Sequence, residues 1–166
     1  MIYAFDVYYN GNIAQAVGIA FQEWSDLHPK EVYKELIINI EAYEPGAFYK
    51  RELPCLLKII DKLNLSVNDI LIVDGYVFLD DDEKPGLGFH LYDHLKRVVP
   101  VVGIAKKKYA DISKLSREIV RGASMQPLYV TAIGIDLDTV AENIRSMQGE
   151  FRIPALLRRL DYLSRN

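Results

Sequence analysis

A short apolar run constrains the fold of this chain more than any other feature of the sequence. Within Asp69–Val73, every residue after the aspartate is apolar. Strands of this kind are covered on both faces by helices in α/β proteins. Further apolar strands are predicted at Val99–Ala105 and Leu128–Ile135. We therefore expect a sheet whose central strands are buried on both sides.

The N-terminal segments favour a meander of antiparallel strands. Strands are predicted at Ile2–Tyr9, Ile13–Gln22 and Val32–Ala42. Between the first two, residues 10–12 read Asn-Gly-Asn, which is a signal for a tight hairpin turn. Three neighbouring strands therefore come before the first helix.

Helical spacing predicts a helix over Ala47–Leu63 and another over Leu87–Val98. Pro54 is tolerated only near a first turn, so the ordered part of the first of these helices is expected to begin near Arg51. The segment Ile112–Ile119 is predicted to be either helical or irregular.

Two more helices are predicted near the C-terminus. Asp136 and Asp138 can cap a helix that runs to about Met147, and Pro154 can occupy the first turn of a helix that ends at Arg165. Strands that meander and then alternate with helices indicate an α/β fold, with a mixed β-sheet flanked by helices on both faces. The length of 166 residues and the 50% hydrophobic content suit a single domain with a real core.

Bulk properties narrow the functional classes. The one cysteine, Cys55, excludes an internal disulfide and a metal site built from several cysteines. No apolar stretch approaches the roughly 20 residues that cross a bilayer, and no basic region precedes the N-terminal apolar segment, so we expect a cytoplasmic protein with no membrane partner. The net charge of −3 gives no overall sign of nucleic-acid binding.

Four carboxylates stand where carboxylates are costly. Asp6 interrupts the first apolar run, Asp74 ends the run that follows Asp69, Glu52 follows a Pro-Gly turn, and Asp161 lies on the last amphipathic helix. A buried, unpaired carboxylate costs several kcal/mol or more, so it neutralises or finds a cation. Acids that converge from separate elements suggest an oxygen-ligand site for a hard ion such as magnesium, and hence phosphoryl-transfer chemistry.

Each acid also has a plain structural interpretation. Asp6 could face solvent from an edge strand, and Asp74 with the following glycine could form a two-residue hairpin turn. Glu52 could form a helix-surface pair with Arg51, and Asp161 could lie on the solvated flank of an apolar helix face. The order of the acids favours the other interpretation, because it matches a ribonuclease H-like arrangement in which the first and fourth strands are neighbours.

The motifs along the chain resemble those of the endonuclease V family, in the same order. They are Tyr43-x-Pro-Gly-x-x-x-x-Arg-Glu52, Val73-Asp74-Gly75, Gly86-x-x-x-His90-Leu91, Val102-Gly103-Ile104-Ala105-Lys106, Arg121-Gly122, and Arg152-Ile153-Pro154 with Arg158. The resemblance implies a single endonuclease V-like domain over residues 1–166 with a ribonuclease H-like sheet. It also implies a magnesium-dependent endonuclease of nucleic-acid repair that cuts at the second phosphodiester 3′ of an inosine.

The resemblance assigns catalytic residues one by one. Asp6, Glu52 and Asp74 match the family's catalytic metal-binding acids, and Asp161 falls where members carry a residue that assists the second metal position. Lys106 matches a lysine near the scissile phosphate. The expected cofactor is Mg²⁺, with Mn²⁺ as a possible substitute.

The substrate-binding residues also follow from the resemblance. Tyr43 and Pro45 fall on a wedge motif that props the strands apart, and Gly46 and Gly75 match glycines that let hypoxanthine approach the backbone. Flipping a base into such a pocket costs a few kcal/mol. The expected partner is DNA or RNA with a modified base, with deoxyinosine DNA favoured; a monomer is favoured, but the sequence does not set the oligomeric state.

Two departures from the family pattern leave other functions open. Val77 replaces a glycine that members usually carry after the Asp-Gly pair. Asp80-Asp81-Asp82-Glu83-Lys84-Pro85 occupies the place of a His-Pro-Arg segment, and these acids repel phosphate unless they hold a cation. The alternatives are a weak or inactive nucleic-acid-binding module of the same fold, or a structure-selective nuclease.

Two groups of basic residues have both structural and functional interpretations. Lys106-Lys107-Lys108 follows a strand end, where it can form a solvated turn or contact phosphate. The arginines near the C-terminus can complement the dipole of the last helix, which is the favoured interpretation, or take part in the function; they are Arg152, Arg158, Arg159 and Arg165.

Overall fold

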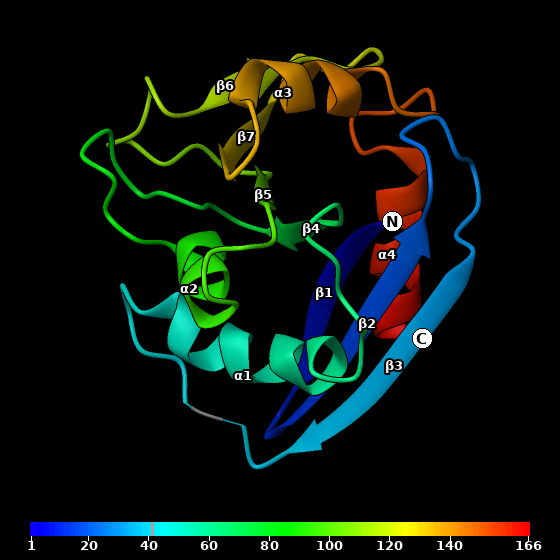
Figure 1. The fold of residues 1–166 in the computed structure, drawn as a ribbon, viewed down its shortest axis with the longest axis vertical. Coiled ribbons are helices and arrows are strands. Elements are labelled where there is room, and N and C mark those ends of the chain that lie inside the picture. Colours follow the sequence, from blue (N-terminus) through cyan, green and yellow to red (C-terminus); the bar gives the residue numbers. More distant parts are fainter. Residues whose placement is uncertain (41) are drawn as a thin grey trace.

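The computed structural model describes residues 1–40 and 42–166, which form one mixed sheet of seven strands in the order β3-β2-β1-β4-β5-β7-β6 (Figure 1). The strands are β1 Ile2–Asn10, β2 Ile13–Phe21, β3 Glu31–Ile38, β4 Ile70–Asp74, β5 Val101–Ala105, β6 Arg117–Ile119 and β7 Leu128–Ile133.

The first three strands form the predicted antiparallel meander, with a hairpin at Gly11, where φ is +64°. β4 then pairs in parallel with β1 on one side and with β5 on the other. β7 runs antiparallel to β5. The predicted α/β fold is therefore confirmed, including the ribonuclease H-like placement of the first strand beside the fourth.

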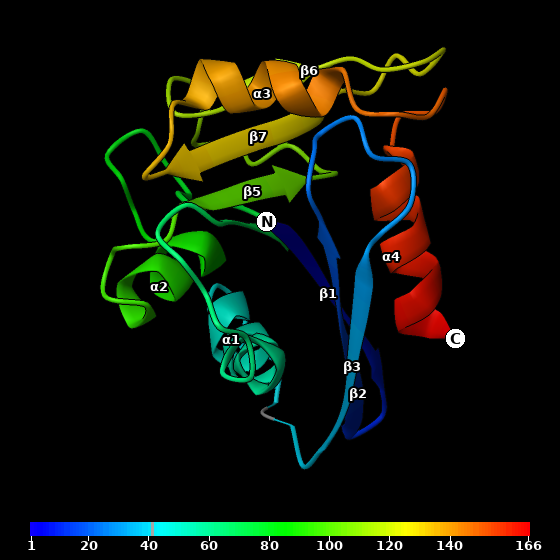
Figure 2. The same ribbon diagram turned by 45° about the vertical axis from the view of Figure 1, so that its right-hand side comes forward.

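Helices cover both faces of the sheet, as predicted (Figure 2). They are α1 Phe48–Ile60, α2 Leu87–His94, α3 Leu137–Arg145 and α4 Ala155–Arg165. Alternate residues of β1 point to the two sides: Phe5 packs with α1 and α2, and Ala4 packs with α3 and α4. None of the described helices is both long and apolar enough to span a bilayer.

Several predicted boundaries are wrong, and local backbone geometry gives the reason. β3 ends at Ile38 instead of reaching Ala42, since Asn39 adopts a positive φ of 57°; Glu41, which the predicted strand included, lies outside the described residues. α2 ends at His94 instead of Val98, because Lys96 and Arg97 have φ values of 59° and 60°. Left-handed residues of this kind end a helix or a strand.

α1 begins at Phe48 rather than near Arg51, so Pro54 lies inside the helix instead of in its first turn. A proline there removes one backbone hydrogen bond of the helix. Burial of Leu56 and Ile59 against the sheet offsets that loss, since each is 1% exposed.

The segment predicted as helical or irregular contains a short edge strand, β6, which pairs with β7. The C-terminal helices follow the prediction more closely. The Thr139 backbone N–H donates to Asp136 Oδ2 at 2.9 Å, which confirms the aspartate cap of α3. Pro154 directly precedes α4 and so opens it.

A buried arginine fixes the connection between α3 and α4. Arg121 is 5% exposed. Its guanidinium donates to four backbone carbonyls, those of Arg145, Met147, Gly149 and Phe151. Desolvation lowers the pKa of this arginine because burial disfavours its charged form. The four carbonyl oxygens replace water as hydrogen-bond acceptors and so stabilise the buried charge. The arginine therefore holds the connection between α3 and α4 in place.

Replacing this guanidinium should destabilise the protein. Arg121→Met leaves four carbonyls without their donor, and we expect the free energy of unfolding to fall by about 2–4 kcal/mol. Urea denaturation followed by circular dichroism measures the change. Arg159→Met, at an exposed position of α4, serves as the control and should change stability by about 0.5 kcal/mol or less. Equal effects of the two substitutions would contradict this account.

Candidate active site

The register of two parallel strands brings the first two carboxylates together. Ala4 of β1 pairs with Ile72 of β4, and two residues further along each strand stand Asp6 and Asp74. β1 is an internal strand, so the edge-strand interpretation of Asp6 is wrong. β4 has parallel neighbours on both sides, so the hairpin interpretation of Asp74 is also wrong.

The third carboxylate, Glu52, reaches the same region from α1 on the other face of the sheet. It is 4% exposed, so it is not the surface residue of the plain structural interpretation. The Tyr9 hydroxyl donates a hydrogen bond to Glu52 Oε2. The Arg51 guanidinium lies over the Tyr9 ring, 3.8 Å from its centroid, and thus packs on the tyrosine that holds the acid.

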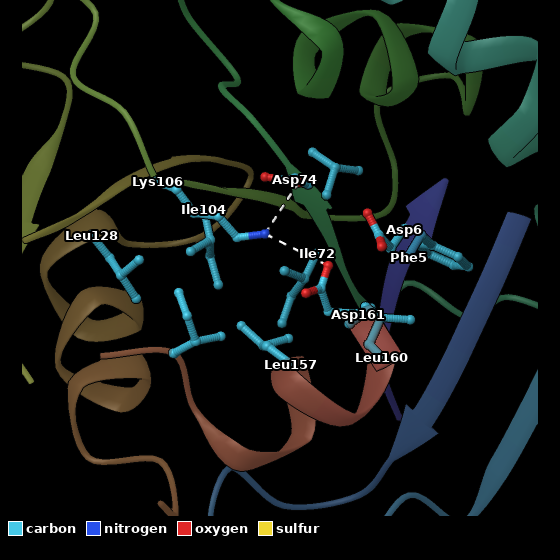
Figure 3. Close-up of a pocket in the computed structure, with 13 residues that line it drawn as sticks. Phe5, Asp6, Ile72, Asp74, Ile104, Lys106, Leu128, Leu157, Leu160 and Asp161 are labelled. Carbon is cyan, nitrogen blue, oxygen red and sulfur yellow. Dashed lines mark ion pairs between the residues drawn. The ribbon is translucent and has the colours of Figure 1, made fainter. Parts of the chain in front are cut away.

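The fourth carboxylate and the lysine close the site from α4 and β5 (Figure 3). Lys106 Nζ lies 3.7 Å from Asp74 Oδ2 and 4.0 Å from Asp161 Oδ1. The Asp161 side chain is 40% exposed, but it faces the cavity at the strand ends instead of only the solvent. The Ser164 hydroxyl, one turn further along α4, donates to Asp6 Oδ2 at 2.6 Å. Carboxylates from β4 and α4 thus pair with one lysine, and Asp6 of β1 lines the same cavity.

Burial and mutual repulsion disfavour the ionised forms of Asp6, Glu52 and Asp74. Burial is the main cause of the raised pKa of Glu52, which reaches about 8, and the charges of Asp6 and Asp74 add to it. Burial also raises the pKa of Asp6, against the hydrogen bond from Ser164, and the pKa of Asp74, against the charge of Lys106. Such a group of acids favours the approach of a cation.

A small cavity separates the acids from the apolar core. Its volume is about 40 Å³, and its lining includes Asp6, Asp74, Lys106 and Asp161 above apolar side chains such as Ile104. That space suits an ion or a water molecule. It is far too small for a nucleobase, since ligand pockets usually measure about 300–1,000 Å³.

The chemistry of the donors fits Mg²⁺ or Mn²⁺, because carboxylate oxygens are the ligands these hard ions prefer. In residues 1–40 and 42–166, however, no three His, Cys, Asp or Glu side chains are grouped closely enough to hold an ion together. The ammonium of Lys106 instead lies between Asp74 and Asp161. Binding a shared ion therefore requires the carboxylates to move closer together.

The predicted substrate-binding residues lie on two surface segments. Tyr43 is 58% exposed, and Pro45 and Gly46 are exposed beside it in the connection between β3 and α1. Gly75 directly follows Asp74 at the end of β4. Gly46 and Gly75 have φ values of +78° and +127°, and a Cβ at either position would meet nothing within 4 Å. These glycines are thus explained by backbone conformation, and both have open space beside them.

Two site residues were not predicted from the sequence, namely Tyr9, which holds Glu52, and Ser164, which holds Asp6. Arg152, which belongs to the motif Arg152-Ile153-Pro154, donates to the carbonyl oxygens of Lys106 and of two residues before β7. The assignment of Arg152 to the dipole of α4 is wrong, since it lies before that helix and binds carbonyls at strand ends. Ser164 could have been found, because it stands three residues after Asp161 and so shares its helix face.

These features define an α/β protein with an acidic site at the carboxyl end of β4, beside the parallel strand β1. Such sheets carry their ligands at the carboxyl ends of strands. A family model described as Endonuclease V matches residues 1–147. The chain belongs to the endonuclease V family. The matched range includes Asp6, Glu52, Asp74 and Lys106, and Asp161 lies beyond it.

Solved structures share the fold over 99% of this chain. Endonuclease V from Streptomyces avermitilis has a TM-score of 0.73, 23% identity and 79% of its own length covered. Endonuclease V from Bacillus subtilis has a TM-score of 0.74, 20% identity and 78% coverage. Endonuclease V from Ciona intestinalis, in complex with a 24mer DNA containing an inosine followed by a ribo-adenosine, has a TM-score of 0.75, 18% identity and 83% coverage. A search of curated proteins found no match.

The raised pKa of Glu52 predicts a pH-dependent stability in the metal-free protein. Its folded-state pKa of about 8 exceeds the ordinary 4.5, so its contribution is fully present below about pH 4.5 and is lost as the pH rises through about 8. Glu52→Gln avoids that loss and keeps an acceptor for Tyr9. We expect the variant to exceed wild type in stability by about 2–4 kcal/mol at pH 9, and by much less at pH 4.5.

Urea titrations across pH 4–9 in the presence of a chelator measure this difference. Glu44→Gln is the control, since Glu44 is an exposed residue. A stability difference between Glu52→Gln and wild type that does not change with pH would contradict the assignment.

Proposed function

We propose that this protein is a metal-dependent endonuclease of nucleic-acid repair that cleaves inosine-containing strands, preferentially deoxyinosine DNA, near the 3′ side of the altered base. The observation that carries the proposal is the alignment of Asp6 and Asp74 on neighbouring parallel strands, opposite Lys106 and Asp161. Membership of the endonuclease V family supports the reaction class. The inosine-containing DNA bound by the Ciona intestinalis protein supports the substrate class.

Four acids would hold a divalent metal ion, namely Asp6, Glu52, Asp74 and Asp161. A bound Mg²⁺ or Mn²⁺ ion would polarise the phosphodiester and help water to attack it. The chain's own contribution is to fix the ligands. Ser164 restrains Asp6 from α4, and Tyr9 restrains Glu52 from β1.

Lys106 has a second task in this proposal. Its ammonium is paired loosely, at 3.7 Å from Asp74 and 4.0 Å from Asp161, and it retains 43% exposure. A bound cation would neutralise those carboxylates and so weaken their hold on the lysine. The ammonium of Lys106 would then contact the scissile phosphate and stabilise the charge that develops on it.

The altered base would be bound outside the small acidic cavity. Gly75 and Gly46 combine left-handed backbone with open space, which allows a flat ring to approach the chain closely. Tyr43 and Pro45 are exposed next to Gly46 and would support the strand where the base leaves the stack.

Neutralising either strand acid should abolish cleavage without unfolding the protein. Asp6→Asn and Asp74→Asn each remove a charged ligand, so we expect the rate at saturating substrate to fall by about 100-fold or more. The removal of mutual repulsion should leave the metal-free proteins as stable as wild type or more stable. Single-turnover cleavage and thermal melting measure the two effects.

Asp82→Asn makes the same chemical change at an exposed acid that has no hydrogen bond or ion pair through its side chain among the described residues. It should leave the cleavage rate within about two-fold of wild type. Cleavage that persists in both purified Asp6 and Asp74 variants would contradict the proposed mechanism.

The substrate is tested with end-labelled single-stranded DNA and RNA, each with and without one inosine, in the presence of magnesium. The proposal predicts a product cut one nucleotide beyond the inosine, with DNA preferred, and no product from Asp74→Asn. Tight binding without cleavage, in magnesium or in manganese, would instead favour the binding-module alternative. Preferential cutting of branched junctions without inosine would favour a structure-selective nuclease.

A further inference from the structure

A basic loop leaves the site directly after Lys106. We call residues 106–115, between β5 and β6, the lysine loop. It carries four lysines, Lys106, Lys107, Lys108 and Lys114, and one acid, Asp111. Lys107 and Lys114 are exposed, and Lys108 is exposed but lies 4.0 Å from Glu118, so this loop adds positive charge next to the site in a chain whose net charge is −3.

The near end of the lysine loop is tied to the segment that follows Asp74. The Tyr76 hydroxyl donates to the Lys107 carbonyl at 2.7 Å and accepts from the Tyr109 N–H at 3.0 Å. Tyr76 itself is 8% exposed, so its hydroxyl is a fixed point inside the loop.

The far end of the lysine loop is bound to residues 80–85, which we call the acidic segment. Among the described residues of that segment, only Asp81 makes hydrogen bonds to the loop. Asp81 Oδ1 accepts from the backbone N–H groups of Ser113 at 3.0 Å, Lys114 at 2.7 Å and Leu115 at 3.2 Å. Its Oδ2 accepts from the Ser113 hydroxyl at 3.0 Å. These bonds lower the pKa of Asp81, so they favour its charged form.

The neighbouring acids do not share this contact. Asp80 accepts from the N–H groups of Asp82 and Lys84, each at 2.9 Å, and so closes its own turn. Asp82 and Glu83 are exposed. Ile112 is 3% exposed and packs in the core, which keeps the loop attached to the protein even without Asp81.

We propose that Asp81 is a positioning residue that holds the far end of the lysine loop, so that the exposed Lys114 meets a phosphate of the bound strand next to the site. The proposal rests on the proposed function, because it supplies the contacts of that same site to its polyanionic substrate. Asp81 also carries a negative charge that repels phosphate. That repulsion is screened beyond about 10 Å, whereas an ordered lysine at a phosphate releases a counterion directly.

Two alanine variants separate the anchor from the charge. Asp81→Ala and Asp82→Ala remove the same charge from adjacent positions, but only the first breaks the contact to the lysine loop. Repulsion alone predicts tighter nucleic-acid binding by both variants. The anchor predicts binding about 3–10-fold weaker for Asp81→Ala, and binding as tight as wild type or tighter for Asp82→Ala. Asp81→Asn, which keeps an oxygen acceptor, should be intermediate.

Binding is measured by fluorescence anisotropy of a labelled single-stranded inosine oligonucleotide, without divalent ions and over a series of salt concentrations. For Asp81→Ala, the slope of log affinity against log salt should become shallower by about 0.7 for each phosphate that a lysine no longer neutralises. Hydrogen exchange should show faster exchange at the amides of residues 113–115 in Asp81→Ala only. A purely structural role would not change the salt slope.

Each other outcome contradicts a stated part of the proposal. Equal affinities and slopes for Asp81→Ala and Asp82→Ala would show that Asp81 acts only through its charge. Faster exchange throughout Asp81→Ala would show general destabilisation instead of a local anchor. If the wild-type protein binds no nucleic acid, the proposed function is contradicted, and the role of Asp81 with it. If the wild-type protein binds and the two variants have equal affinities, only the role of Asp81 is contradicted.

Discussion

The parallel pairing of β1 with β4 is the constraint on which the rest of the site depends. It sets Asp6 and Asp74 at the same level on neighbouring strands, where their charges repel each other. The surrounding elements make this arrangement tolerable. α4 supplies the Ser164 hydroxyl to Asp6, and the end of β5 supplies the ammonium of Lys106 to Asp74. The sheet thus holds two carboxylates close together, although their mutual repulsion opposes that arrangement.

The acids and their order could be predicted from the sequence, because an acid inside an apolar run is visible in one dimension. The partners of those acids could not. Tyr9 holds Glu52 only because β1 passes next to α1, and that pairing depends on the three-dimensional packing of a helix on a strand. The short strand β6 was missed for a related reason, since its edge position is set by pairing with β7 rather than by its own residues.

The acidic segment shows how far a one-dimensional interpretation of charge can mislead. From the sequence, residues 80–83 form a continuous repulsive patch. In the structure, the carboxylates of Asp80 and Asp81 accept hydrogen bonds from backbone N–H groups, and only the next two acids are directed to solvent without such bonds among the described residues. Hydrogen bonds in which one partner is charged are stronger than those between neutral groups. Asp80 and Asp81 are therefore explained by the local structure that their carboxylates hold together.

The same features that destabilise the metal-free site make it suitable for a cation. Glu52 is buried with a tyrosine hydroxyl as its hydrogen-bond donor, and its pKa of about 8 means that ionisation costs free energy in the folded state. A ligand that binds only the folded, ionised form recovers that free energy, so stability and ion affinity are thermodynamically linked. Lys106 fits this logic, because pairs of 3.7 Å and 4.0 Å are close enough to reduce the repulsion and loose enough to be exchanged for a stronger cation.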